Sequence, residues 1–553
     1  MKQLYDFFLE KWRILNIDKC DWITQNQLKI KQAKSKLKPI PNEKPLKVLC
    51  WGITAWERGA FEHMLAFSMK LRGHKVIGVR CHGGISSCSM ESVFYPRPDC
   101  EDCKNRNKRL LGTFGLNEDY VELNQYITAE KELECKKMIE GLSIDELKNF
   151  CYKGIDIGRI SFRDLPQYFF KLIDVNDPQY EQRIRDSVLG NLIITEASFN
   201  ALEAIKPDRL IVTNGKTISH AGIYEIALQM NISTLTWDEA VGGVDSFVLS
   251  FDKFANEYDL SDIWKIQKDK PLTDVENKWL DNFFQLTQKG KFGRFNYYED
   301  PITDKNEIIQ TLNLDPNKKI IALLCNLTWD TSALGRDIGF ENMFDWIFTN
   351  IDFCIANPEY QLIIRCHPVE DKGFDDSRTV ERVPDKIHEK YSELPDHIKI
   401  IRGKSELNSH AICSFSDFIS LYTTSVGLEM SMKGRHVLIS GECHYRDKGF
   451  GHCITSKKEY LETLNADPIQ TISNEAVEYS RRYAYCFVKR SMSYIPEFHH
   501  NTRFRYHIED PLSFAPGSGS HWDSLCKNIE EKGIFMDSTP FVETWDEEGN
   551  KKV

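Results

Sequence analysis

The sequence lacks the features that mark several classes of protein. No apolar run approaches the ~20 residues that a membrane-spanning helix needs. Residues 1–22 carry acidic and aromatic side chains throughout, unlike a signal peptide. The chain shows no short-period repeat, and its net charge of −11 argues against nucleic-acid binding. We therefore expect a globular cytoplasmic protein whose first helix packs on the core, on a partner or on the inner face of a membrane.

Cysteine is well represented but shows no disulfide pattern. Sixteen cysteines in a large chain without a secretory signal predict reduced thiols. Four of them, Cys81, Cys88, Cys100 and Cys103, lie in one predicted loop that ends in Cys-x-x-Cys. They could hold a structural zinc ion, although the first two are farther apart than in ordinary zinc fingers. The alternative is four unconnected thiols in an ordered loop.

The chain has room for two or three domains of ~150 residues. An apolar strand at 46–52, a helix at 60–71 with apolar residues three or four positions apart, and a strand at 75–79 form a β-α-β pattern. This pattern is typical of a doubly wound α/β sheet. Its first turn lacks G-x-G-x-x-G, so no dinucleotide cofactor is indicated.

The remaining periodicity predicts a second α/β half. Helical spacing at about 105–200 indicates a helical insertion, and the charged helical stretch 255–315 is the best inter-domain connection. The predicted units are a helical lead-in and linker at 1–45, a first α/β domain at 46–290, a second at 300–472, and a return helix with a tail at 473–553.

Polar residues follow three predicted strands of the first half. Asn214 and Lys216 follow one strand, Glu239 follows another, and Glu57 lies after the first. Ligands collect outside the carboxyl ends of parallel strands, so these loops should share one rim. Glu57 is the first choice for a catalytic base and Glu239 the second, while each could equally be structural. Asn214-Gly215 could be a plain turn.

Three loops of the second half should also meet at one edge. They are 326–330, 365–368 and 423–429, and they carry a cation, an imidazole, hydroxyl groups at a helix start, and a carboxylate. Cations and helix starts bind phosphate, and a carboxylate accepts hydrogen bonds from ribose hydroxyls. This combination indicates a site for a nucleotide-activated sugar. Each motif taken alone is more often structural.

The motifs of this half resemble those of a known family. They are R-x-H-P at 365–368, T-T-S-x-G-L-E at 423–429, G-R-x-V at 434–437 and H-Y-R-x-K-G-F at 444–450. Together they resemble the capsule-polysaccharide-biosynthesis glycosyltransferases, relatives of the bacterial Kdo transferases. The resemblance touches most of residues 46–500. It implies an α/β protein with the GT-B fold, in which two Rossmann-like domains face each other across a cleft, here with a helical insertion in the N-terminal one.

The resemblance also implies roles for individual residues. His367 would be catalytic, with Glu57 or Glu239 as the acceptor-side base, and Asn214 and Lys216 would lie on the acceptor side. The implied donor-binding residues are Asn326, Trp329, Asp330, Arg365, His367, Thr424, Ser425, Glu429, Tyr445, Lys448 and Gly449.

The implied reaction is metal-independent sugar transfer. No convincing D-x-D follows a strand, so no cofactor is expected for catalysis beyond the structural zinc considered above. The favoured donor is a CMP-linked ulosonic acid, and the acceptor would be a glycan or a lipid-linked glycan. Two alternatives remain open: a nucleotide-sugar epimerase on the same fold, and a non-catalytic binding subunit of a glycan-assembly complex.

Overall fold

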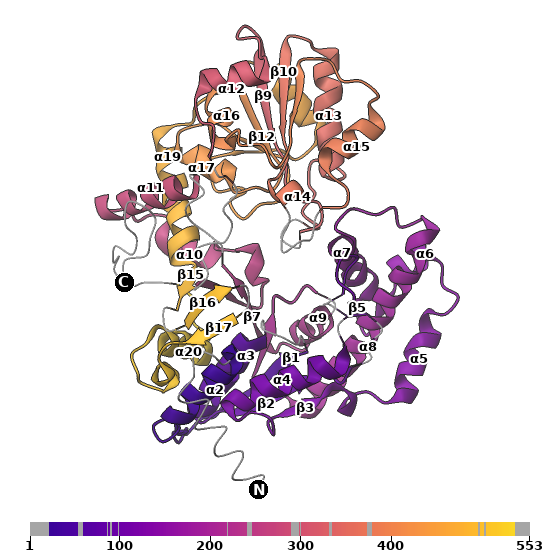
Figure 1. Cartoon of the computed structure of the whole chain (residues 1–553), viewed down its shortest axis with the longest axis vertical. Helices are drawn as coiled ribbons and strands as arrows, with labels where there is room; N and C mark the ends of the chain where they lie inside the picture. The colour runs from indigo at the N-terminus through magenta and orange to yellow at the C-terminus, as the bar shows by residue number, and fades with distance from the viewer. Residues whose placement is uncertain are drawn as a thin grey trace.

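The computed structural model describes most of the chain. The described residues are 21–53, 59–83, 85, 87–88, 91–97, 99–217, 219–240, 246–288, 298, 300–330, 334–372, 379–495, 498–502 and 505–536. They form two α/β domains, one above the other in Figure 1. Each domain is built on its own sheet. The predicted α/β fold with two Rossmann-like domains of the GT-B type is confirmed.

The N-terminal domain is built on a seven-stranded sheet. Its order is β15-β8-β7-β6-β1-β2-β3, and the strands from β7 to β3 pair in parallel. β8 runs antiparallel to both of its neighbours. The strands are β1 (Lys47–Gly52), β2 (Lys75–Arg80), β3 (Tyr120–Glu122), β6 (Arg209–Thr213), β7 (Ser233–Glu239), β8 (Ser246–Phe251) and β15 (Met492–Tyr494).

The predicted insertion at about 105–200 is mostly helical. Its longest helix, α8 (Glu181–Ile205), is buried along most of its length. The other helices of this domain are α2 (Trp22–Ala33), α3 (Gly59–Leu71), α4 (Cys100–Phe114), α5 (Ala129–Ile139), α6 (Ile144–Lys148), α7 (Ile157–Phe169) and α9 (Ala221–Gln229). A small hairpin of β4 (Cys151–Tyr152) and β5 (Ile155–Asp156) precedes α7. α7 lies nearest to the upper domain in Figure 1.

The C-terminal domain is built on a six-stranded parallel sheet in the order β11-β10-β9-β12-β13-β14. Its strands are β9 (Lys319–Leu324), β10 (Tyr360–Arg365), β11 (Ile398–Ile401), β12 (Phe418–Leu421), β13 (Leu438–Ile439) and β14 (His452–Cys453). Its helices are α12 (Lys305–Leu312), α13 (Met343–Ala356), α14 (Val369–Lys372), α15 (Val383–Lys390), α16 (Ser409–Phe415), α17 (Val426–Met432) and α18 (Lys457–Asn465). Side chains of β9, β10 and β12 are almost entirely buried because helices cover both faces.

Helices also connect the two domains. The chain passes through α10 (Ser261–Gln267) and α11 (Asp274–Gln288) from the N-terminal to the C-terminal domain. It returns to the N-terminal domain through α19 (Asn474–Tyr485). α19 continues as a π-helical turn at Cys486–Arg490 and ends at β15 in the N-terminal sheet. One hydrophobic core runs through this region and joins residues of both domains. Within the described residues, no helix is long and apolar enough to cross a membrane.

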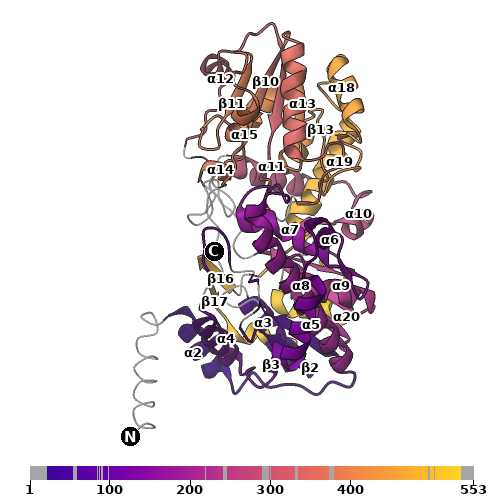
Figure 2. The same cartoon turned by 90° about the vertical axis from the view of Figure 1, so that its right-hand side faces the viewer.

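The end of the chain packs against its beginning. β16 (Phe498–Thr502) pairs with β17 (Arg505–Ile508), and α20 (His521–Glu531) lies against α3, as Figure 1 and Figure 2 both show. Arg72 at the end of α3 forms a buried ion pair with Asp523 of α20. Trp522 is fully buried in the same core. Residues far apart in sequence therefore stabilise one domain.

We expect Asp523→Ala to lower the free energy of unfolding by about 3–5 kcal/mol, because it leaves the Arg72 guanidinium buried without its partner. Burial raises the pKa of Asp523, but hydrogen bonds from Lys527 and Gly517 and the charge of Arg72 outweigh it, so the pKa is lowered overall. This contribution to stability is therefore present at neutral pH and is lost as the pH falls through that lowered pKa. Urea unfolding at neutral and acidic pH measures it.

Lys527→Ala is the comparison variant, because Lys527 is largely exposed and its ion pair with Asp523 should contribute less than the buried pair of Asp523 and Arg72. Equal losses in the two variants would contradict a stabilising role for the buried pair.

Candidate functional site

The three predicted loops of the C-terminal domain meet at the carboxyl edge of its sheet. β9 pairs with β10 on one side and with β12 on the other, so their following loops are neighbours. The Asn326 amide donates a hydrogen bond of 2.7 Å to the Thr423 hydroxyl and joins the first loop to the third. Asp330 lies near enough to His367 to influence its pKa. The structure thus brings Asn326, Asp330 and His367 to one edge with the turn 423–425.

His367 is neutral at physiological pH in this setting. Burial lowers its pKa to about 4, Arg365 adds to this effect, and Asp330 opposes it. The backbone N–H of Val369 donates to Nδ1 of His367 at 3.2 Å. A neutral ring that accepts at Nδ1 carries its proton on Nε2. His367 can therefore offer an N–H donor, but it holds no positive charge.

The Arg365 side chain forms its hydrogen bonds within the C-terminal domain. The residue is 2% exposed, and its donors go to the carbonyl oxygens of Arg402 and Ser405 and to the hydroxyls of Ser409 and Tyr298. These bonds fasten the end of β10 to the segment before α16. The donor-binding role predicted for Arg365 stays a prediction.

The turn 423–425 lies over a buried tyrosine. The Thr424 hydroxyl accepts a hydrogen bond of 3.4 Å from the N–H of Val426, while Ser425 is exposed and makes no side-chain capping bond. Tyr445 is 1% exposed and donates to the Thr424 carbonyl at 2.6 Å. It supports the turn from the protein side, and its predicted role in donor binding stays a prediction. A Cβ at Gly427 would lie 2.4 Å from the Tyr445 hydroxyl, so glycine is required there.

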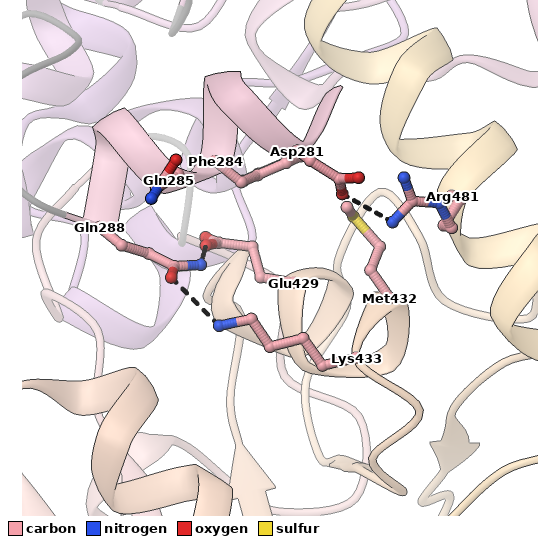
Figure 3. Close-up of a pocket in the computed structure, with 8 residues that line it drawn as sticks. All are labelled: Asp281, Phe284, Gln285, Gln288, Glu429, Met432, Lys433 and Arg481. Carbon is pink, nitrogen blue, oxygen red and sulfur yellow. Dashed lines mark hydrogen bonds and ion pairs between the residues drawn. The ribbon is translucent and has the colours of Figure 1, made fainter. Parts of the chain in front are cut away.

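Glu429 lines a small pocket among α11, α17 and α19 (Figure 3). It is 6% exposed and pairs with His410 at 2.7 Å and with Gln288 at 3.4 Å. Lys433 bonds to Gln288 at the rim, and the pocket encloses about 150 Å³. A carboxylate that lines a pocket can still accept hydrogen bonds from hydroxyl groups. Binding of the donor's ribose by Glu429 therefore stays a prediction.

Trp329 lies at the boundary between the domains. It is 5% exposed, donates to the Thr379 hydroxyl at 3.0 Å and contacts Phe170 of the insertion, with ring centroids 4.5 Å apart. In the loop between β13 and β14, Lys448 is half-buried, and Gly449 is exposed with a φ of 89°, a conformation that favours glycine.

The predicted acceptor-side residues lie at the carboxyl edge of the first sheet. Asn214 is buried and accepts a hydrogen bond from the N–H of Lys216. Lys216 forms an ion pair of 2.6 Å with Glu257, and burial lowers its pKa to about 8. Glu239 ends β7 and accepts a weak hydrogen bond of 3.4 Å from Tyr506. Glu57, the first choice for the base, lies outside the described residues.

Cys81, Cys88 and Cys100 lie near one another. Burial raises the pKa of Cys81 to about 11, with smaller contributions from the other two thiols. In the part of the chain that the structure describes, no group of three or more His, Cys, Asp or Glu side chains is arranged to hold a metal ion. The zinc site, including Cys103, stays a prediction.

Sequence reasoning missed four charged or titratable residues at the domain boundary: Arg163, Glu257, Arg336 and His444. Arg336 pairs with Glu257 across the boundary at 3.5 Å. No motif pointed to Arg163, Glu257 or Arg336, and His444 was read only as part of a family motif. These residues are far apart in the sequence and come together only in the folded protein.

Comparison with known proteins gives structural similarity only. No protein-family model matches the chain. No curated protein matches it either. The KpsC β-Kdo 2,4-transferase of Thermosulfurimonas dismutans has 13% identity and a TM-score of 0.34 over 52% of this chain and 81% of its own. The β-Kdo 2,7-transferase of the same KpsC has 13% identity and a TM-score of 0.31 over 68% and 95%.

A third structure is the UDP-GlcNAc 2-epimerase of Neisseria meningitidis bound to UDP-GlcNAc. It has 12% identity and a TM-score of 0.20 over 88% of this chain and 100% of its own. Similarities of this size do not indicate an activity or a substrate for this chain.

We expect Arg365→Gln to lower the free energy of unfolding by roughly 3 kcal/mol or more, because two backbone carbonyls and two hydroxyl groups lose a charged donor. Thermal and urea unfolding measure this loss. Arg382→Gln is the control, since Arg382 is more exposed and pairs only with Asp371 and Asp385. An Arg365→Gln protein as stable as the wild type would contradict the assigned role.

Proposed function

We propose that the chain is a glycosyltransferase that moves a sugar from a nucleotide-activated donor, with a CMP-linked ulosonic acid favoured, to a glycan or lipid-linked glycan acceptor. The observation that carries this proposal is the meeting of His367, Asn326, Asp330 and the hydroxyl-bearing turn 423–425 at one sheet edge. Ligands of open parallel sheets collect at such edges.

In the proposed reaction, the donor's phosphate group lies on the turn 423–425. The bond between the anomeric carbon and the phosphate oxygen breaks, and its electron pair goes to that oxygen. The neutral His367 ring stabilises the departing phosphate through its Nε2–H hydrogen bond rather than by delivering a proton, because its pKa of about 4 leaves it uncharged. A low-dielectric, half-buried setting strengthens such a bond.

The acceptor would approach from the N-terminal domain. Its hydroxyl oxygen forms the new bond to the anomeric carbon, and a carboxylate takes the hydroxyl proton. Glu57 remains the first choice for this base and Glu239 the second. Phe170 of the insertion packs on Trp329 and joins the two domains beside the donor site.

We expect His367→Ala to lower kcat by roughly 10²–10³-fold, the usual effect of removing one donor to a developing negative charge. A radiolabelled-sugar transfer assay measures it. The wild-type rate should show no titration of this ring between about pH 6 and 8, because the ring is already neutral there.

His388→Ala is the matched control, because that ring only bonds to the Pro384 carbonyl on α15. Unchanged transfer by the His367→Ala protein would rule out the assigned role. Partner assembly without any wild-type transfer would favour the non-catalytic alternative.

Binding of CMP, CDP, UDP and GDP should separate the donor classes. At a ligand concentration about a hundredfold above Kd, the bound nucleotide should stabilise the fold by ~2.7 kcal/mol. Thermal shift with each nucleotide reports this, and we expect the largest shift with CMP. Conversion of a nucleotide sugar without any acceptor would favour an epimerase, and no binding of any nucleotide or nucleotide sugar would refute the proposal.

A further inference from the structure

A group of cations lies at the junction of the two domains. Arg163 comes from α7, Lys216 from the loop after β6, Arg336 from the loop before α13, and Lys448 from the loop before β14. We refer to these four side chains as the junction cluster. They come from both domains, so only the assembled structure brings them together.

One carboxylate joins the two domains within this cluster. Oε1 of Glu257 lies 2.6 Å from Nζ of Lys216 and 3.5 Å from Nη2 of Arg336. Lys216 is 2% exposed and Arg336 is 9% exposed, whereas the Glu257 side chain is 35% exposed. The two cations are therefore fixed in the protein, and the acidic partner is the solvent-facing member.

The cluster has more positive than negative charge. Burial first, and then the charges of Arg336 and Arg163, lower the pKa of Lys216. Arg336 and Lys448 likewise help burial to lower the pKa of His444 to about 3. These cations thus lie close enough to repel one another, with Glu257 between two of them.

Burial lowers the pKa of Arg163 and the adjacent Asp164 carboxylate opposes this, whereas three other neighbouring carboxylates interact with groups outside the cluster. Asp259 pairs with Lys253 at 2.9 Å, and Glu225 pairs with Arg159 at 2.7 Å. Asp337 accepts a hydrogen bond from Tyr422. Among the described residues, Glu257 is the acidic side chain that forms ion pairs with this cluster.

Buried donors in the cluster have no acceptor. Nε of Arg163 and Nε of Arg336 are buried and make no hydrogen bond. Unsatisfied buried donors are unfavourable, so they mark places where a ligand with several acceptor oxygens would gain affinity. A phosphate group has such oxygens and matches the planar fork of arginine.

The cluster adjoins the turn 423–425. A Cβ at Gly441 would lie 3.0 Å from the Thr423 methyl group and 3.2 Å from the Arg336 carbonyl oxygen. The N–H of Glu442 donates to that same carbonyl at 2.8 Å. The Arg336 loop therefore packs beside the turn on which the proposed function places the donor phosphate.

We propose that Arg336 and Lys216 form a phosphate-binding site that spans the two domains, and that Glu257 occupies this site until the phosphate of the nucleotide donor displaces it. This inference rests on the proposed function. Arg336 thereby supplies the positive charge that the sequence assigned to Arg365, whose donors are bound inside the protein. Because the cations come from both domains, phosphate binding also holds the domains together.

The test measures the affinity for inorganic pyrophosphate, CMP and cytidine by calorimetry at fixed ionic strength. Arg336→Gln should weaken pyrophosphate and CMP binding roughly tenfold to a hundredfold, as expected for a lost charged hydrogen bond. Cytidine binding should not change, because it has no phosphate. Arg336→Lys keeps the charge and should recover part of the affinity.

Glu257→Gln should change the affinity for pyrophosphate in the opposite direction. It removes the competing carboxylate, so pyrophosphate should bind several-fold more tightly than to the wild type. Arg159→Gln is the charge-matched control, since Arg159 lies on α7 and pairs with Glu225 rather than with Glu257. Circular dichroism on each variant shows that it is folded.

Pyrophosphate binding that Arg336→Gln and Lys216→Met leave unchanged would overturn the inference. So would weaker binding by Glu257→Gln, because it would mean that Glu257 only stabilises the domain junction. If the Arg336→Gln protein has the same KM for the nucleotide sugar as the wild type, the phosphate site is rejected and the proposed function is unaffected. Loss of pyrophosphate binding in Arg336→Gln, together with no binding of any nucleotide sugar, would keep the site and reject the proposed function.

Discussion

Parallel pairing of β9 with β10 and β12 is the constraint on which the candidate site depends. Strands in parallel register end at the same edge, and helices on both faces leave that edge as the place where polar loops reach solvent. The short bond between Asn326 and Thr423 then fixes two of the loops to each other.

Burial decides what each charged side chain can do. Arg365 and Arg336 are both nearly buried, yet Arg365 has its donors bonded to carbonyls and hydroxyls of its own domain. Arg336 faces the other domain, with one buried nitrogen unpaired. His367 loses its charge for the same reason, because transfer from water disfavours the imidazolium form. The same residue types therefore differ in charge and in hydrogen bonding according to their surroundings.

The two domains share more than a linker. α19 crosses back and ends in β15, which adds to the N-terminal sheet, and α20 packs on α3 through the buried pair of Arg72 and Asp523. The hydrophobic core under α10, α11 and α19 is continuous with the C-terminal domain. Such a connection keeps the two sheet edges at a defined distance, while Trp329 and Phe170 provide a smaller contact on the other side.

The sequence by itself determined the two-domain α/β fold, the first β-α-β unit and the three loops that meet at the edge of the second sheet, but it did not indicate β8, β15 or the hairpin of β16 and β17. The features that it determined follow from apolar periodicity and from the rule that parallel strands end together, both of which are local in the chain. Tertiary structure alone decided that Arg365 and Tyr445 support the site from within, and that Arg163, Lys216, Glu257 and Arg336 meet at the junction. Burial and long-range charge pairing depend on residues more than a hundred positions apart in some cases, as for Arg72 and Asp523, and no local pattern carries that information.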